Sequence, residues 1–275
     1  MSGAIQASDL KMGPALKVLA VNECRSLERS LAAGKARHER IHEVRKSSRR
    51  LRSLLALFTP LQNRRAVTLD KALRQLVHSF SALRDAHVAV RTARLMATSQ
   101  EALTPALVGA LKRHSATLLG EALESDPGWR RRRVKVRRIV EAVEKLPWQL
   151  VSPSVAKSAL KRSAKRMKKA RGAALEQRTV IALHRWRRRA RHLRYQLEFL
   201  RKARRMANMK KKRTQQYANQ IKRLASMTDR LGWRQDFQVF MDALGHLPSS
   251  ADARELREAL QRKSARLSKM SPSQP

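Results

Sequence analysis

The stretch IHEVRKSSRRLRSLLALF, from Ile41 to Phe58, decides the fold of this chain, because LHRWRRRARHLRYQLEFL, from Leu183 to Leu200, repeats its pattern. In each stretch a histidine at the second position is followed by basic residues three, four, seven and ten positions later. This spacing places all of these side chains on one stripe of an α-helix. The stripe holds His42, Arg45, Lys46, Arg49 and Arg52 in the first stretch and His184, Arg187, Arg188, Arg191 and Arg194 in the second.

A second stripe, of apolar and small residues, runs beside the basic stripe in both stretches. Such a pattern is typical of an amphipathic helix that packs one edge against a core. We therefore predict two helices, each with a buried edge and a neighbouring row of cations. The apolar stripe holds Ile41, Val44, Ser48, Leu51, Leu55 and Phe58, and its counterpart holds Leu183, Trp186, Ala190, Leu193, Leu197 and Leu200.

The charge of the chain restricts its partners. The 275 residues carry a formal net charge of +41, with a sequence pI near 11.8. A charge of this size favours polyanionic partners, namely nucleic acid, anionic lipid or polyphosphate, without choosing among them. Hydrophobic residues make up 42% of the chain, which is enough to build a core.

Cysteine content and hydropathy indicate the compartment. The single cysteine, Cys24, excludes an intramolecular disulfide framework and is expected to fill a small space in the core. The first residues lack the pattern of a secretory signal, and no apolar run has the length of a membrane span. We therefore expect a cytoplasmic protein.

Helical periodicity and turn signals divide the whole chain into helices, and no β-strand pattern of convincing length is present. Pro14 and Pro105 are expected in first helical turns, and Gly172 and Gly232 are expected to end helices. The predicted helices span residues 14–34, 35–58, 68–80, 81–97, 105–123, 129–146, 153–172, 175–206, 215–232, 233–244 and 251–267.

The repeat predicts two helical halves. FSALRDAHV at 80–88 and LGWRQDFQV at 231–239 form a second repeated element, in which Asp85 matches Asp236. These aspartates are expected to cap a helix or to hold nearby arginines. We predict an all-α fold of two repeated helical bundles. The predicted parts are a flexible leader 1–13, a first half 14–146, a linker 147–153, a second half 154–267 and a polar tail 268–275.

The doubled His-x-x-Arg-basic-x-x-Arg-basic-Leu-Arg pattern, followed each time by an aspartate element, resembles the CHAD family, the conserved histidine α-helical domain. The resemblance covers about residues 14–267. It implies two four-helix bundles related by a pseudo-twofold, with the motif helices lining a basic groove that binds inorganic polyphosphate. The chain departs from the pattern at His192, which replaces Arg50 in the second copy, and at Ser81, where the family often has glycine. No triphosphate-tunnel signature is present, so a standalone binder is implied.

These observations give a set of candidate polyphosphate-binding residues. Arginine presents a planar fork to two phosphate oxygens, and lysine presents a point charge. The two histidines either donate hydrogen bonds to phosphate or only pack, and the cationic rows either bind or form a solvated face. The candidates are His42, Arg45, Lys46, Arg49, Arg52, Lys165, Lys169, His184, Arg187, Arg188, Arg191, Arg194 and Tyr195.

Other functions remain open at this stage. A sequence-nonspecific nucleic-acid-binding protein would use the same cations, and binding of DNA at low salt is expected of any chain this basic. An enzyme acting on phosphoanhydrides is less favoured, because Glu43 and Glu198 of the motif helices occupy non-equivalent positions. A metal site at His38 and His42 is disfavoured by the surrounding arginines, and no metal or cofactor is expected. Targeting to polyphosphate granules is a further expectation.

Overall fold

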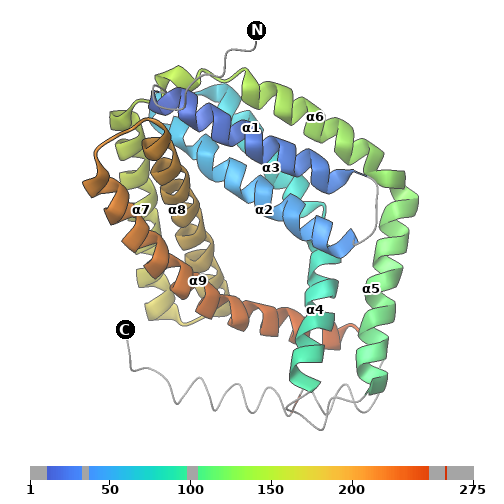
Figure 1. The fold of residues 1–275 in the computed structure, drawn as a ribbon. Helices are drawn as coiled ribbons and strands as arrows, with labels where there is room; N and C mark the ends of the chain where they lie inside the picture. Colours follow the sequence, from blue (N-terminus) through green and yellow to red (C-terminus); the bar gives the residue numbers. More distant parts are fainter. Residues whose placement is uncertain (1–10, 33–36, 98–104, 248–257, 259–275) are drawn as a thin grey trace. The chain divides into compact units, whose positions relative to one another are not determined.

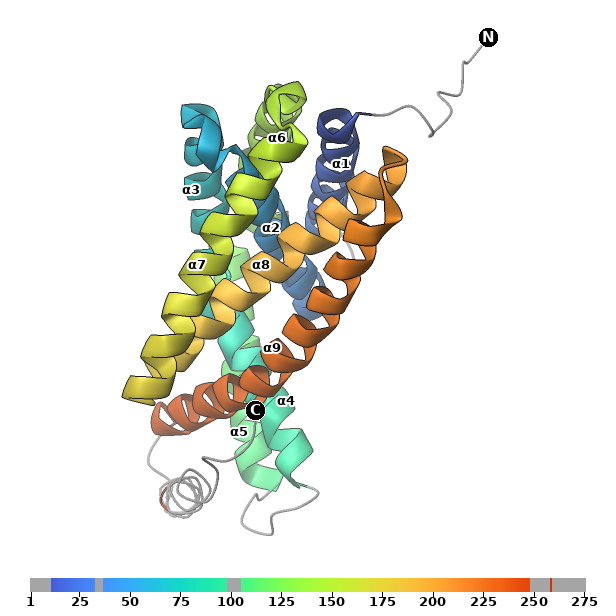
Figure 2. The same ribbon diagram turned by 90° about the vertical axis from the view of Figure 1, so that its left-hand side faces the viewer.

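Every regular element of the structure is helical in the residues that it describes, which are 11–32, 37–97, 105–247 and 258 of the computed structural model (Figures 1 and 2). The all-α class predicted from the sequence is confirmed for these residues. The α-helices are α1 (Met12–Leu31), α2 (Arg37–Leu55), α3 (Arg64–His78), α4 (Ser81–Ala97), α5 (Pro105–Ser125), α6 (Arg130–Glu144), α7 (Pro153–Gln177), α8 (Val180–Met206) and α9 (Lys211–Gly245). Three short 3-10 helices are η1 (Ala56–Leu61), η2 (Pro127–Trp129) and η3 (Trp148–Leu150).

Side-chain caps fix several helix starts. Ser152 accepts a hydrogen bond from the backbone N–H of Val155, and Pro153 occupies the first turn of α7, where the predicted helix also begins. Thr179 caps α8 in the same way. Asn63 caps α3, so this helix begins at Arg64 and the predicted start at residue 68 is too late.

Two predicted helix ends are wrong. Gly172 lies inside α7, which continues to Gln177 and ends where Arg178 adopts a left-handed backbone with φ of 52°. As a result α8 begins at Val180 and not at 175. Gly232 lies inside α9, which runs without a break to Gly245. The usual glycine ending of a helix needs a positive φ, and neither position has one.

The remaining helix boundaries lie closer to their predicted positions. The α2 helix tightens into η1 at Ala56, and the chain reverses at Gln62, whose φ is 50°. The predicted linker 147–153 contains η3, in which Trp148 is buried. The end of the first predicted helix, at residue 34, and the last predicted helix, apart from Glu258, lie outside the described residues.

The described residues fall into two compact units, one within Met1–Phe80 and Asp126–Gly232, the other within Ser81–Ser125 and Trp233–Pro275. The first unit therefore takes helices from both predicted halves. The predicted halves were defined by the sequence repeat, and the division into two compact units does not test that repeat. The division at 147–153 stays a prediction.

In the first unit α7 packs along α8, and α1 and α2 pack on one another and on α8 (Figures 1 and 2). Ser47 and Ser48 of α2 and Ala190 of α8 are buried. Their small side chains let the neighbouring helices approach closely. Phe58 and Trp148 meet edge to face with ring centroids 5.0 Å apart. Burial, followed by the charge of nearby glutamates, raises the pKa of the Cys24 thiol to about 12, which fits the expected core position.

The second unit has its own apolar core and ion pairs. Its core residues come from α4, α5 and the last turns of α9, and include Val90, Leu111 and Phe240. Asp236 accepts hydrogen bonds from Arg84 at 2.6 Å and from Arg91 at 2.8 Å, and Asp85 also pairs with Arg84. The prediction that the repeated aspartates hold arginines is confirmed. Within the described ranges, no helix has the length and apolarity needed to cross a membrane.

Replacement of two glycines with alanine should change the stability of the protein in opposite directions. A Cβ at Gly13 would collide with the backbone carbonyl of Trp148, whereas a Cβ at Gly172 would meet open space. We expect Gly13→Ala to lower the free energy of unfolding by roughly 1–3 kcal/mol, and Gly172→Ala to raise it by roughly 0.5–1 kcal/mol. Urea unfolding followed by circular dichroism measures both. A Gly13→Ala variant as stable as the wild type would contradict the packing of α1 on η3.

Candidate functional site

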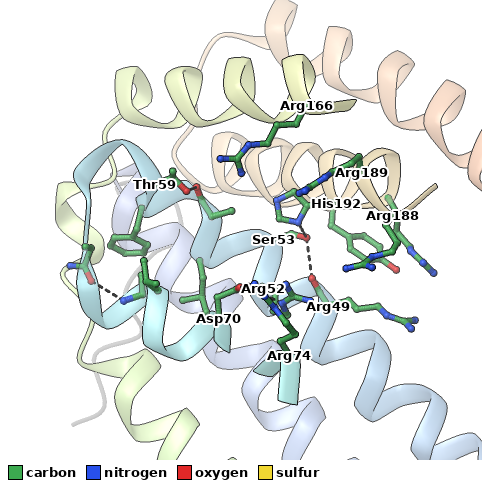
Figure 3. Close-up of a pocket in the computed structure, with 18 of the residues that line it drawn as sticks. Arg49, Arg52, Ser53, Thr59, Asp70, Arg74, Arg166, Arg188, Arg189 and His192 are labelled. Carbon is green, nitrogen blue, oxygen red and sulfur yellow. Dashed lines mark hydrogen bonds and ion pairs between the residues drawn. The ribbon is translucent and has the colours of Figure 1, made fainter. Parts of the chain in front are cut away.

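A basic cavity of about 450 Å³ lies in the first unit, between α2, η1 and α3 on one side and α7 and α8 on the other (Figure 3). Its floor includes the η1 residues Phe58 and Thr59, which the tightening of α2 at Ala56 brings to this position. Among the described lining residues, arginine is the dominant type and one residue carries a carboxylate. The lining arginines are Arg49, Arg52, Arg74, Arg166, Arg185, Arg188, Arg189 and Arg191.

The wall formed by α2 and α3 contains its own counter-charge. Asp70 of α3 accepts a hydrogen bond from Arg52 Nε at 2.7 Å and another from Arg74 Nη2 at 3.0 Å. Burial raises the pKa of Asp70, but the hydrogen bonds and charges of Arg52 and Arg74 outweigh it, and the pKa lies below its ordinary value. Asp70 is therefore ionised at neutral pH and partly neutralises this wall.

Four arginines of the opposite wall, formed by α7 and α8, lack such compensation. Within the described part of the chain, no hydrogen bond or ion pair holds Arg166, Arg185, Arg188 or Arg189. Burial and the charges of neighbouring arginines lower the pKa of Arg188 and of Arg189. All four residues are exposed overall, and Arg188 and Arg189 are in addition repelled by neighbouring arginines. A bound anion would relieve this repulsion.

His192 of α8 lies between the two walls. Its Nδ1 is 3.1 Å from the hydroxyl of Ser53 on α2, and Figure 3 shows this contact with Arg166 and Arg189 beside the ring. Burial first, and then the charges of nearby arginines, lower the pKa of His192 to about 4. The imidazole is therefore neutral at physiological pH.

One arginine of the first motif stretch connects three helices and does not line the cavity. Arg50 Nε donates to Glu23 of α1 at 2.6 Å, and its Nη1 donates to Glu198 of α8 at 2.6 Å. The guanidinium also lies over the rings of Tyr195 and Phe199. Burial lowers the pKa of Arg50, but the two carboxylates outweigh it and raise the pKa overall.

Residues 19–245 match the CHAD domain family. The chain belongs to the CHAD family. The family membership indicated by the motif pattern is therefore confirmed. A comparison with curated proteins gives no match.

A solved CHAD domain shares the fold. The crystal structure of the CHAD domain from the plant Ricinus communis aligns with a TM-score of 0.68 and 22% sequence identity. The alignment covers 99% of this chain and 93% of the plant chain. At this level of identity the likeness concerns the fold alone.

The CHAD motif rows divide between the cavity and the interior. The candidates that line the cavity are Arg49, Arg52, Arg188, Arg191 and Tyr195. Arg45 is buried and donates to the carbonyl of Val77 at 2.6 Å. Arg187 donates to the carbonyl of Thr228 at 3.0 Å. The rows thus contribute to helix packing as well as to the cavity.

The other candidates lie elsewhere. His42 and Lys46 are exposed on α2, and Lys46 pairs with Glu43. Lys165 and Lys169 are exposed on α7, and His184 is half-buried on α8. None of these five residues is among those that line the cavity. Arg194, the last candidate, donates to the hydroxyl of Thr228 and pairs with Glu198.

Sequence reasoning missed part of the lining. Arg166 is not among the candidates, whereas its neighbour Lys165 is. The buried residues Ala159, Ser163 and Ala170 nevertheless put the exposed Arg166 beside the packed face of α7, where it lines the cavity. This stripe of small residues was a readable signal. Asp70 and Arg74 had no such signal, because α3 contacts the motif helix only through the tertiary fold.

The chemistry of the cavity is that of anion binding. Its arginines offer forked donors to phosphate oxygens, and Tyr195 lies buried under Arg50 and Arg194. No group of three or more His, Cys, Asp or Glu that could hold a metal ion is found in the described ranges.

Proposed function

We propose that this CHAD protein binds inorganic polyphosphate in the arginine-lined cavity, without converting it chemically. The α7/α8 wall carries the proposal: five arginines line the cavity there, and no described residue neutralises Arg166, Arg185, Arg188 or Arg189. Polyphosphate has a negative charge on each unit and no apolar surface, so a site rich in forked cations suits it. CHAD domains are generally non-catalytic binding domains.

The dimensions and lining of the cavity support polyphosphate over nucleic acid. A volume of about 450 Å³ is typical of small-ligand pockets and cannot admit a DNA duplex. The lining aromatic residues, Phe58 and Tyr195, are buried and offer no platform on which bases would stack. A thin, flexible phosphate chain is the polyanion that fits this shape.

The carboxylate of the cavity supports binding without catalysis. Metal-assisted phosphoryl transfer uses carboxylates to hold Mg²⁺. Asp70 lines the cavity, but its two oxygens accept hydrogen bonds from Arg52 and Arg74. We infer that the site holds phosphate and does not transfer it.

Several finer features belong to this proposal. They are the pseudo-twofold between the two halves, a groove that extends the cavity along both motif helices, and targeting to polyphosphate granules. The exposed candidates His42, Lys46, Lys165 and Lys169 would contact a chain that continues beyond the cavity.

Competition between polyanions tests the function. We expect long-chain polyphosphate to bind the wild-type protein at about 0.15 M salt and to displace labelled duplex DNA at equal phosphate concentration. DNA should displace bound polyphosphate poorly, because it reaches only the outer cations. Equal displacement in both directions would favour a nonspecific nucleic-acid-binding protein. Release of orthophosphate in proportion to protein would contradict binding without chemistry.

A further inference from the structure

His192 occupies a position where the first motif copy has a permanent cation. The two copies are offset by 142 residues, so His192 corresponds to Arg50, which two carboxylates hold. His192 has no carboxylate partner among the described residues and lines the cavity instead. This chain therefore places a titratable ring at the centre of its arginine cluster.

The hydrogen bonds of Ser53 favour one tautomer of this ring. While the hydroxyl of Ser53 donates its one hydrogen to the carbonyl oxygen of Arg49 at 3.0 Å, its oxygen is left to accept from His192 Nδ1–H at 3.1 Å. The neutral ring then has no proton on Nε2. Within the described residues Nε2 has no hydrogen-bond partner.

The surroundings keep the ring neutral while the cavity is empty. The pKa of His192 is about 4, chiefly through burial and then through the charge of Arg52. The nearby carboxylate, Asp70, favours the charged ring but is engaged by two arginines. The charged groups that line the cavity with the ring are Arg49 and Arg52 of α2, Asp70 and Arg74 of α3, Arg166 of α7, and Arg185, Arg188, Arg189 and Arg191 of α8.

A phosphate oxygen in this cavity would face a nitrogen that is itself an acceptor. Two acceptors repel unless a proton lies between them. The added negative charge also offsets the cations that oppose protonation. We propose that His192 is a phosphate-binding residue that contacts the ligand in its protonated form, so that each binding event takes up a proton. This inference rests on the proposed function and specifies how the site responds to pH.

The sign of the pH dependence follows. The pKa of the ring is about 4 in the free protein and is higher in the complex. Between these two pKa values, affinity rises by up to about tenfold for each unit by which the pH falls. Below about pH 4 the ring is charged in both states, and the His192 contribution to the slope disappears.

Calorimetry tests proton uptake directly. Long-chain polyphosphate, whose few terminal groups add little titration, is bound at about pH 5.5 in two buffers with different ionisation enthalpies. We expect the wild type to take up nearly one proton more per site than His192→Gln. The control is His114→Gln, an exposed histidine of α5 in the second unit, and it should match the wild type.

Two further measurements keep the test decisive. His192→Arg, which copies the first motif, should bind with no His192-dependent rise toward low pH. Proton NMR of the wild type should show the His192 ring titrating at higher pH with polyphosphate than without it. Equal proton uptake by wild type and His192→Gln, with an unmoved NMR titration, would overturn this inference alone. Failure of the wild type to bind would overturn the proposed function and the inference together.

Discussion

Replacement of Arg188 and Arg189 with glutamine should weaken polyphosphate binding by roughly 30-fold, which corresponds to about 2 kcal/mol. Both side chains line the cavity, and no described residue pairs with them. Each loss removes one forked contact to phosphate. The dependence of log affinity on log salt should also decrease by roughly 1.4–1.8 units, by analogy with nucleic acids.

The matched control removes the same charge from exposed residues that lie outside the cavity. Arg133 and Arg137 are exposed on α6, one helical turn apart, and neither lines the cavity. Arg133→Gln with Arg137→Gln should change affinity by roughly twofold or less, because it alters only the general field of the protein. Equal losses from the two double variants would show that overall charge, and not the cavity, binds the ligand.

The stability of the cavity variant separates binding from folding. Arg188 and Arg189 repel their neighbours, and this repulsion contributes to the lowered pKa of both. Their removal should leave the free energy of unfolding unchanged or slightly higher. A weakened affinity in a fully folded variant would therefore report on contacts with the ligand.

Arg50→Ala, unlike the Arg188 and Arg189 replacements, should act on stability. It should lower the free energy of unfolding by about 3 kcal/mol. The Arg50 side chain is 13% exposed and pairs with Glu23 and Glu198, which are 16% and 24% exposed. Its removal leaves two half-buried carboxylates without their strongest partner and opens a gap beside Tyr195 and Phe199. Urea unfolding at neutral pH measures the loss.

A triple variant identifies the cause. Arg50→Met combined with Glu23→Gln and Glu198→Gln removes the cation together with both carboxylate charges. Replacement of a whole buried ion network costs less than removal of one partner. We expect the triple variant to be more stable than Arg50→Ala. If both lose the same free energy, the ion pairs contribute little and the packing of the side chain dominates.

Helix locations were largely predictable from the sequence, and the error at Gly232 has a physical origin. The limits of α4 and the start of α7 follow from local signals such as Ser152 and Pro153. Gly232 was misread as a stop because its role is tertiary. A Cβ at this position would approach Arg187 Nη2 to 2.6 Å, so glycine lets α9 pack against the α8 guanidinium. No local pattern contains that contact.

The basic character of the candidate cavity was predictable from the sequence, and its geometry was less so. The cationic row of α2 spans an arc of roughly 120° around the helix, which is wide enough for its two edges to face different surroundings. Arg45 at one edge is therefore buried and bound to Val77, while Lys46 at the other is exposed. Spacing identifies the face of a helix but does not say which neighbour covers each edge.

The network around Arg50 and the cavity around His192 have a consequence for the duplicated motif. Two helices with matching cation spacing are not interchangeable parts. In the first helix Arg50 occupies the middle position and pairs with carboxylates of two other helices. In the second helix His192 occupies the same position and lines the cavity. Transplanting either stretch into the place of the other would carry the right charges to the wrong neighbours. The two motif helices are therefore similar in sequence but make different contacts.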